Sequence, residues 1–311
     1  VLGALKFVSY TEDLPAVIQN FAIDHHLYAD DTQLSDEPRI TSIAASISNM
    51  EHCVDAVQAW CASRRLQLNP SKSEIIWFGT RATLKGLENT DLSLHVGMNT
   101  VAPSNVVRDL GVLLDSELTM RQHISKITGL CFYHLRRLKK VRRILGSSIT
   151  CRLVTAFVIS RLDYCNALLA GLPQSTIAQL QRVQNAAVRL VSGLRPRDHV
   201  TPSLRDLHWL PIQYRIIYKL CLMMHNAHVG RSPRYIIDAL SPTSDMPIRQ
   251  RLRSSAGCRY EIPKLRLKMG ERAFSYSGPA SWNSLPSELT SITDTQTFKS
   301  RLKTHLFRLA Y

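Results

Sequence analysis

The sequence predicts an α+β fold, because strand-like and helix-like patterns of apolar residues follow one another along the chain. Short apolar runs bounded by turn residues occupy positions 22–28, 32–34, 92–96 and 106–114, as expected of strands. From Met120 onward, apolar residues recur every three or four positions, which indicates helices. A length of 311 residues with 45% hydrophobic content suffices for two or more packed units. We therefore expect a small antiparallel sheet with helices, then a mostly helical region, then a mixed C-terminal region.

Charge divides the chain into an acidic and a basic part. Residues 1–119 hold 8 Lys and Arg against 15 Asp and Glu, whereas residues 120–311 hold 31 against 9. The whole chain has a formal net charge of +15 and a pI near 9.8. An excess of this size on one part indicates a surface that binds a polyanion, although a solvated basic face is the alternative.

Seven cysteines are spread along the chain without a CxxC pair or a regular spacing. This pattern is typical of reduced thiols in an intracellular protein. A zinc site built on His52, Cys53 and Cys61 is a weaker alternative, since no second ligand pair follows at the usual spacing.

Two adjacent carboxylates, Asp30 and Asp31, stand at a predicted bend between two apolar runs. The turn is expected at Ala29-Asp30-Asp31, where Asp is favoured because its side chain can bond its own backbone. Neighbouring carboxylates repel each other, and a hard cation such as Mg²⁺ relieves that repulsion. The pair therefore indicates a metal site, and a solvated polar turn is the alternative.

The remaining elements are predicted from the same two periodicities and from Gly and Pro positions. We expect helices over 41–65, 123–144, 148–169, 177–191, 212–228 and 295–309, a strand over 75–78, and a strand over 259–267 that Pro263 interrupts. The three helices after Met120 are separated by Gly146 and by Gly171-Leu172-Pro173. The most apolar region, 149–172, contains Arg152, Arg161 and Asp163, so it predicts packed helices and not a membrane span.

A basic cluster lies in the first of these three helices. Residues 120–200 contain 14 Lys and Arg but only two acids, Asp163 and Asp198. This composition predicts a groove that follows a phosphate backbone, and a nuclear-localisation tract is compatible with it. The residues of this basic cluster are Arg136, Arg137, Lys139, Lys140, Arg142 and Arg143.

Basic and aromatic residues also alternate in the C-terminal region. Residues 230–257 are rich in Pro, Ser and Arg, and Arg249, Arg251 and Arg253 are expected in a loop. The aromatic residues that follow suit stacking on the bases of single-stranded RNA, and burial in a core is the alternative. These aromatic residues are Tyr260, Phe274, Tyr276 and Trp282.

Three segments of the first 34 residues together resemble the reverse transcriptases of non-LTR (LINE-type) retrotransposons, in the jockey and chicken-repeat group. They are residues 1–7, Asp13-Leu14-Pro15, and the run from His26 to Leu34 that includes Tyr28-Ala29-Asp30-Asp31. Residues 271–286 and the closing helix resemble the end of the same open reading frames.

The resemblance implies a C-terminal fragment of an RNA-directed DNA polymerase. It assigns residues 1–119 to a partial polymerase palm with a primer-grip-like hairpin, 120–197 to a helical thumb and 198–311 to a basic C-terminal region. The implied activity is copying of element RNA into DNA by two-metal nucleotidyl transfer with Mg²⁺. The implied partners are an RNA template, a DNA primer or target and deoxynucleoside triphosphates, in the nucleus and without a membrane.

The resemblance also implies roles for individual residues. Asp30 is expected as a metal ligand, Asp31 as a supporting acid and Tyr28 as a contact to the primer terminus. Lys72, after an Asn-Pro turn, is expected near the departing pyrophosphate, where an ammonium stabilises negative charge; a solvated turn is the alternative. Leu110-Gly111 is expected at the tip of the hairpin that holds the primer end.

One departure from the family pattern limits these expectations. The second metal-binding aspartate of the family lies on an earlier strand, upstream of Val1. We therefore expect this chain to be inactive alone, and a non-catalytic RNA- or DNA-binding remnant of a retroelement is the alternative function.

Overall fold

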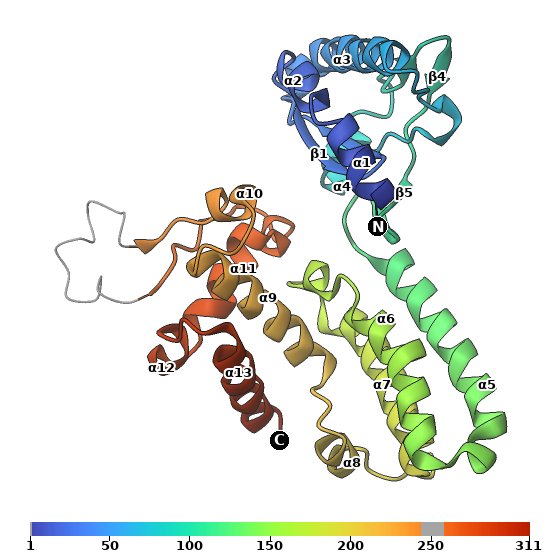
Figure 1. Cartoon of the computed structure of the whole chain (residues 1–311), viewed down its shortest axis with the longest axis vertical. Helices are drawn as coiled ribbons and strands as arrows, with labels where there is room; N and C mark the ends of the chain where they lie inside the picture. The colour runs from blue at the N-terminus through green and yellow to red at the C-terminus, as the bar shows by residue number, and fades with distance from the viewer. Residues whose placement is uncertain (1, 244–257) are drawn as a thin grey trace. The chain divides into compact units, whose positions relative to one another are not determined.

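The computed structural model describes residues 2–243 and 258–311, and it confirms the predicted α+β class (Figure 1). Helices dominate these residues, and the strands among them form three two-stranded sheets. The chain divides into two compact units. The smaller unit comprises residues 1–109 with 115–117, and the larger comprises 110–114 with 118–311. The boundary expected after residue 197, between a helical thumb and a basic C-terminal region, stays a prediction.

The smaller unit is built of short elements around one apolar core. Helices α2 and α3 supply most of this core, which consists of Leu14, Ile18, Ile23, Cys53 and Val57. The elements are α1 (Leu2–Tyr10), α2 (Leu14–Gln19), β1 (Asp24–Tyr28), β2 (Asp31–Ser35), η1 (Ile40–Ser42), α3 (Ile43–Ser63), η2 (Pro70–Lys72), α4 (Arg81–Lys85), β3 (Leu94–Val96), β4 (Asn99–Val101) and β5 (Val106–Asp109).

The sequence predictions for this unit succeed where a periodic pattern is long and fail where a proline interrupts pairing. The helix expected over 41–65 is confirmed as α3. The strand expected over 75–78 is wrong, because only Ile75 forms a bridge, with Pro103. Proline has no N–H group to donate, so the ladder cannot continue through Pro103.

The larger unit is mostly helical. Its first residues complete a hairpin with β5, and the break between the two units lies within that hairpin. The elements are β6 (Val112–Asp115), α5 (Arg121–Val154), the π-helical turn η3 (Thr155–Ile159), α6 (Ser160–Asp163), η4 (Asn166–Leu169), α7 (Gln174–Ser192), α8 (Thr201–Asp206), α9 (Ile212–His228), α10 (Arg234–Asp238), η7 (Gly270–Arg272), α11 (Phe274–Asn283), α12 (Ser287–Thr290) and α13 (Thr295–Ala310).

Gly146 breaks the long helix α5, as expected from the sequence. Its backbone angles of φ 73° and ψ 174° are non-helical and belong to a region that glycine tolerates best. The helical stretch Arg121–Asp163 is long and apolar enough to cross a membrane by length and composition alone. Because Gly146 divides this stretch and Val154 and Val158 lie in the apolar core, this is weak evidence for a span.

Two apolar cores fill the larger unit, and α9 contributes to both. Ile212, Ile216 and Leu220 belong to the first core, which α5 and α7 largely form. Cys221 and Met224 belong to the second core, with residues of α11 and α13. Figure 1 shows α9 running beside α11 and α13, in agreement with the contacts between these helices. Helix α9 therefore joins the two cores.

For two of the C-terminal aromatic residues, the structure decides between stacking on RNA bases and burial in a core. Trp282 is fully buried and Tyr260 is 7% exposed, both in the second core. The alternative of burial is thus confirmed for these two residues, and base stacking by them is wrong. The strand expected over 259–267 is also wrong, since Tyr260 forms only a single bridge with Pro242. The predicted loop around Arg249, Arg251 and Arg253 lies outside the described residues.

A close helix crossing lies in the second core, and each of the two cores contains a buried thiol. A Cβ atom on Gly278 of α11 would lie 2.8 Å from the Met224 sulfur of α9, so the crossing has room only for hydrogen. All seven cysteines are free, as expected. Burial raises the pKa of the Cys131 thiol to about 11 and that of Cys221 to about 12, which keeps both protonated and unreactive.

His225 is fully buried in the second core and is held in its neutral form. Its ring stacks on Phe298 with centroids 4.2 Å apart, and Nε2 lies 3.2 Å from Thr295 Oγ1. Nδ1 is buried without a partner among the described residues. Desolvation is the main cause that lowers the pKa of His225. The charges of His228, Arg231 and Lys299 lower it further, whereas Asp294 raises it.

We predict that acidification destabilises this core through His225. Its pKa is lower in the folded than in the unfolded protein, so stability is unaffected well above pH 6.5. As pH falls through 6.5, the unfolded chain binds a proton that the folded chain excludes, and stability falls. Urea unfolding at pH 7.5 and 5.5 should show a smaller loss for His225→Gln than for the parent protein. The exposed His199→Asn control should lose as much as the parent; an equal loss in all three proteins would contradict the prediction.

Candidate catalytic hairpin and nucleic-acid-binding surface

The Asp-Asp pair stands at the tip of the β1–β2 hairpin. Tyr28 pairs with Asp31, so the turn consists of only Ala29 and Asp30, and Asp31 begins β2. The turn expected from the sequence, Ala29-Asp30-Asp31, is one residue longer than the observed turn. Ala29 has φ 54°, in the left-handed region, which costs a residue other than glycine about 1–2 kcal/mol. The tip is therefore a tight, strained turn that presents both carboxylates.

The two faces of this hairpin differ. Leu27 and Leu34 pack against the core of the smaller unit. Side chains alternate between faces along a strand, so Tyr28, Asp31 and Gln33 lie on the opposite face. Asp30 and Asp31 are both exposed, and Tyr28 is 62% exposed. The hairpin thus offers its acids and Tyr28 to solvent.

The donor set for a cation is only partly present. Carboxylate oxygens are the ligands that Mg²⁺ prefers, so Asp30 and Asp31 suit one side of a site. Among the described residues, however, no group of three or more His, Cys, Asp or Glu side chains is arranged to hold a metal ion. A cage of carboxylates would need at least one further acid.

A contact that sequence reasoning missed joins this hairpin to β5. The Gln33 side-chain amide on β2 donates a hydrogen bond to the Asp109 carboxylate at the end of β5, 76 residues away in sequence. Gln33 lies on the same face as Asp31 and Tyr28, so Asp109 contacts the open face of the Asp-Asp hairpin. No local pattern in the sequence signals a pair this distant.

Lys72 occupies the end of the short 3-10 helix η2. Asn69 begins this helix, and its side chain accepts a hydrogen bond from the Ser71 amide at 3.1 Å. Lys72 itself is exposed, and no ion pair with a described carboxylate restrains it. The expected Asn-Pro turn is present, and the role near pyrophosphate stays a prediction.

The β5–β6 hairpin has Leu110 and Gly111 as its two-residue turn. Both have positive φ, 41° and 88°, as a type I′ turn requires. Two side chains of the larger unit anchor this tip. The Tyr164 hydroxyl donates to the Leu110 carbonyl at 2.6 Å, and the Leu113 amide donates to His123 Nδ1 at 3.2 Å. Neither anchor was identified from the sequence.

Helix α5 presents most of the basic cluster to solvent. Its apolar face is buried through Cys131, Leu135 and Leu138. The exposed cations of the cluster are Arg136, Arg137, Lys139, Lys140 and Arg143. Within this group, the Arg137 guanidinium lies over the Tyr133 ring, 5.6 Å from its centroid. This helix face combines positive charge with an exposed aromatic ring, a combination found in proteins that bind single strands.

Arg142 differs from the rest of the cluster. Its Nε donates to the Leu190 carbonyl at 2.5 Å, and a terminal nitrogen donates to the Val191 carbonyl at 3.3 Å. These carbonyls belong to the last turn of α7, where carbonyls lack intrahelical partners. Arg142 thus holds α5 to the end of α7, so its main contacts are with the protein itself.

We predict that Tyr164→Phe loosens the Leu110-Gly111 turn without unfolding the protein. The variant loses the hydrogen bond to the Leu110 carbonyl but keeps the ring, which should cost about 0.5–1.5 kcal/mol. Hydrogen exchange at residues 110–113 should accelerate. The matched control is Tyr276→Phe in α11, whose hydroxyl makes no hydrogen bond to a described residue. Unchanged exchange in Tyr164→Phe would show that the anchor has no effect.

The chain shows a distant relationship to one kind of transposon polymerase. It is 24% identical over 227 residues to a protein described as probable RNA-directed DNA polymerase from transposon BS, from Drosophila melanogaster. The match covers 70% of this chain but only 24% of that relative. No family model and no solved structure matches the chain. The sequence is therefore related, at a distance, to a reverse transcriptase of a transposon.

Proposed function

We propose that this chain is the C-terminal part of the reverse transcriptase of a non-LTR retrotransposon in the jockey and chicken-repeat group. The proposal rests above all on Tyr28-Ala29-Asp30-Asp31 at the tip of a tight hairpin with both acids exposed. The distant transposon relative supports it. In the complete enzyme, an RNA template, a DNA primer or target and deoxynucleoside triphosphates would be the partners, and the site of action would be the nucleus.

In this proposal, the residues of the hairpin bind and orient the reactants. Asp30 and Asp31 would hold Mg²⁺, which supplies activation of the primer hydroxyl and shielding of the triphosphate when bound. Tyr28 is the cross-strand partner of Asp31, so its ring would contact the primer terminus beside the acids. Lys72 would stabilise the departing pyrophosphate. The Leu110-Gly111 turn would hold the primer end.

We further propose that polymerisation requires an acid from outside the described residues. Two acids alone fall short of a cage for two cations, and the described residues contain no larger group. The chain alone should therefore extend no primer. This shortfall also favours a second candidate, a non-catalytic remnant that binds RNA or DNA through α5.

We predict that this chain alone is inactive, and that catalysis by any longer protein that contains it depends on Asp30. An assay with an RNA template, a DNA primer, deoxynucleotides and Mg²⁺ should show no extension by the chain alone. Extension by the longer protein should disappear in Asp30→Asn. The control Asp24→Asn changes an exposed acid at the other end of β1 and should stay active. Extension that survives Asp30→Asn would refute the assignment, and an inactive longer protein would favour the remnant.

We predict that the exposed basic face of α5 carries nucleic-acid binding in both candidates. Changing Arg136, Lys139, Lys140 and Arg143 to Gln should weaken binding to single-stranded RNA. If all four contact phosphates, the slope of log affinity against log salt should fall by roughly 3. The measurement is fluorescence anisotropy across a salt series.

The matched control for this prediction changes Lys264, Lys268, Arg301 and Arg308 to Gln, which removes the same charge from exposed positions of the larger unit. It should keep most of the parent slope. Equal slopes for the two variants would mean that net charge, and not α5, determines binding.

A further inference from the structure

Two exposed aromatic rings lie on α5 and on the π-helical turn η3 that follows it. Tyr133 of α5 is 46% exposed and Phe157 of η3 is 41% exposed. The neighbouring Phe132, by contrast, packs against the first core. A single exposed ring is common at protein surfaces, but these two belong to one group of contacting rings.

His134 joins the two rings. Its imidazole stacks on the Phe157 ring, with centroids 5.3 Å apart and planes 14° from parallel. It also meets the Tyr133 ring edge-on, with centroids 5.4 Å apart. His134 therefore covers one face of the Phe157 ring, and the exposed part of that ring lies away from His134. We refer to Tyr133, His134 and Phe157 as the aromatic cluster.

The backbone of η3 fixes the place of Phe157. In this turn the Ser160 amide donates to the Thr155 carbonyl, five residues back instead of four. Two further carbonyls of the turn accept hydrogen bonds from side chains. Arg161 Nε donates to the Phe157 carbonyl at 3.1 Å, and the Ser160 hydroxyl donates to the Ala156 carbonyl. Single π-helical turns within helices are rare and are frequent at functional sites.

The buried side of η3 packs against the part of α5 that precedes Gly146. Cys131 and Val158 are both fully buried, and the Cys131 thiol donates to the Val158 carbonyl at 3.9 Å. This packing keeps Phe157 beside His134, although the two are far apart in the sequence. The aromatic cluster is thus held by the fold on one side and open on the other.

Two guanidinium groups flank the aromatic cluster. The Arg137 guanidinium lies over the Tyr133 ring and donates to its hydroxyl at 3.2 Å. Arg161 is held to the backbone of Phe157. Desolvation, and then the charges of Arg161 and Arg137, lower the pKa of His134, so its ring is neutral at pH 7. Among the described residues, neither arginine forms an ion pair with a carboxylate.

The charge around the aromatic cluster indicates what kind of partner fits it. Residues 121–162 contain ten Lys and Arg and no Asp or Glu. Exposed rings beside unpaired guanidinium groups suit a partner that has both flat aromatic groups and negative charge. A single strand of nucleic acid presents both, as unpaired bases and phosphates. In a duplex the bases already stack on one another, and an acidic peptide offers the charge without the bases.

We propose that Phe157 and Tyr133 stack on unpaired bases of a single strand, while Arg137 and Arg161 contact its phosphates. In this arrangement His134 supports the Phe157 ring from behind, and Arg137 supports the Tyr133 ring. The proposal rests on the nucleic-acid binding proposed above for α5 and adds to it a preference for unpaired bases.

The test measures binding of labelled oligonucleotides to the full chain by fluorescence anisotropy across a salt series. Phe157→Leu with Tyr133→Leu should weaken binding to single-stranded RNA at least about tenfold, because stacking on the bases is lost. The slope of log affinity against log salt should stay unchanged, because the rings release no counterions. The Gln variant at Arg136, Lys139, Lys140 and Arg143 should instead lower that slope.

Three further probes separate bases from phosphates. An abasic strand of the same length carries the phosphates without the bases, so the parent and the double Leu variant should bind it equally. A duplex of the same sequence should also lose little affinity in the variant. Single-stranded DNA shows which sugar is preferred. A loss of about tenfold for either RNA or DNA supports the proposal, and the strand with the larger loss identifies the partner.

Two matched variants control for loss of apolar surface. Phe157→Trp keeps a ring that stacks and should bind single strands as tightly as the parent protein. Phe78→Leu makes the same change as Phe157→Leu at a phenylalanine of the smaller unit that is 47% exposed, and it should also bind like the parent. Melting temperatures close to that of the parent show that the variants fold.

The outcomes distinguish this proposal from the role of α5. Unchanged affinity of the double Leu variant for single strands would overturn the stacking proposal, as would an equal loss for the abasic strand or the duplex. If the Gln variant still lowers the salt slope in that case, phosphate binding by α5 stands. Binding of none of the probes by the parent protein would overturn both.

Discussion

Helix α9 has to be buried on two sides, and this requirement organises the larger unit. Ile216 and Leu220 pack in one core, and Cys221 and Met224 pack in the other. Burying apolar side chains is the main favourable contribution to folding, at roughly 25 cal/mol per Å² of surface. A helix shared by two cores couples them, because displacing it exposes both at once.

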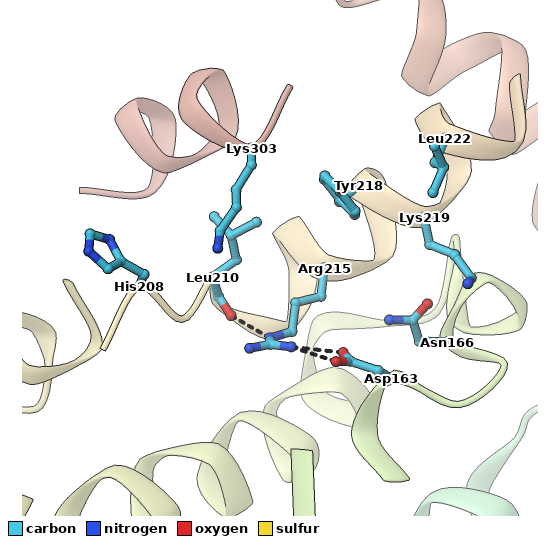
Figure 2. A pocket seen from close by; sticks show the side chains of 9 residues that line it. All are labelled: Asp163, Asn166, His208, Leu210, Arg215, Tyr218, Lys219, Leu222 and Lys303. Carbon is cyan, nitrogen blue, oxygen red and sulfur yellow. Dashed lines mark hydrogen bonds and ion pairs between the residues drawn. The ribbon is translucent and has the colours of Figure 1, made fainter. Parts of the chain in front are cut away.

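Polar contacts then join the hairpins and helix ends to the packed helices and strands. The Arg215–Asp163 ion pair, drawn in Figure 2, links the start of α9 to the end of α6. Tyr164 and His123 anchor the Leu110-Gly111 turn. In the smaller unit, Gln33 and Asp109 connect two hairpins. Each of the two hairpins is thus positioned by a few hydrogen bonds to a packed helix or strand.

Features encoded locally were predictable from the sequence. The bounds of α9 agree with prediction because its apolar period is unbroken, and the Asp-Asp hairpin follows from its turn chemistry. The strand expected over 75–78 failed because its partner in space is Pro103, which no local window reveals. The strand expected over 259–267 contains Pro263 itself, and its single bridge is to Pro242. The residue pattern of one strand does not indicate which residue of another segment will pair with it.

Features that depend on distant partners were not predictable. In the sequence, Arg142 is one of the six residues of the basic cluster and looks like the others. In the structure, its guanidinium donates hydrogen bonds to carbonyls of α7 that are 48 and 49 residues away. The acids at positions 30 and 31 were identified by their adjacency, but the hydrogen bond from Gln33 of the same hairpin to Asp109 needed the fold.

The crossing of α9 and α11 limits which side chains position 278 can carry. Every other amino acid has a larger side chain than glycine, and a Cβ at position 278 would meet Met224 at 2.8 Å and Phe274 at 2.9 Å. Overfilling a packed core of this kind typically costs about 1–3 kcal/mol. A substitution at this one position would therefore weaken the hold of α11 on the helix that both cores share.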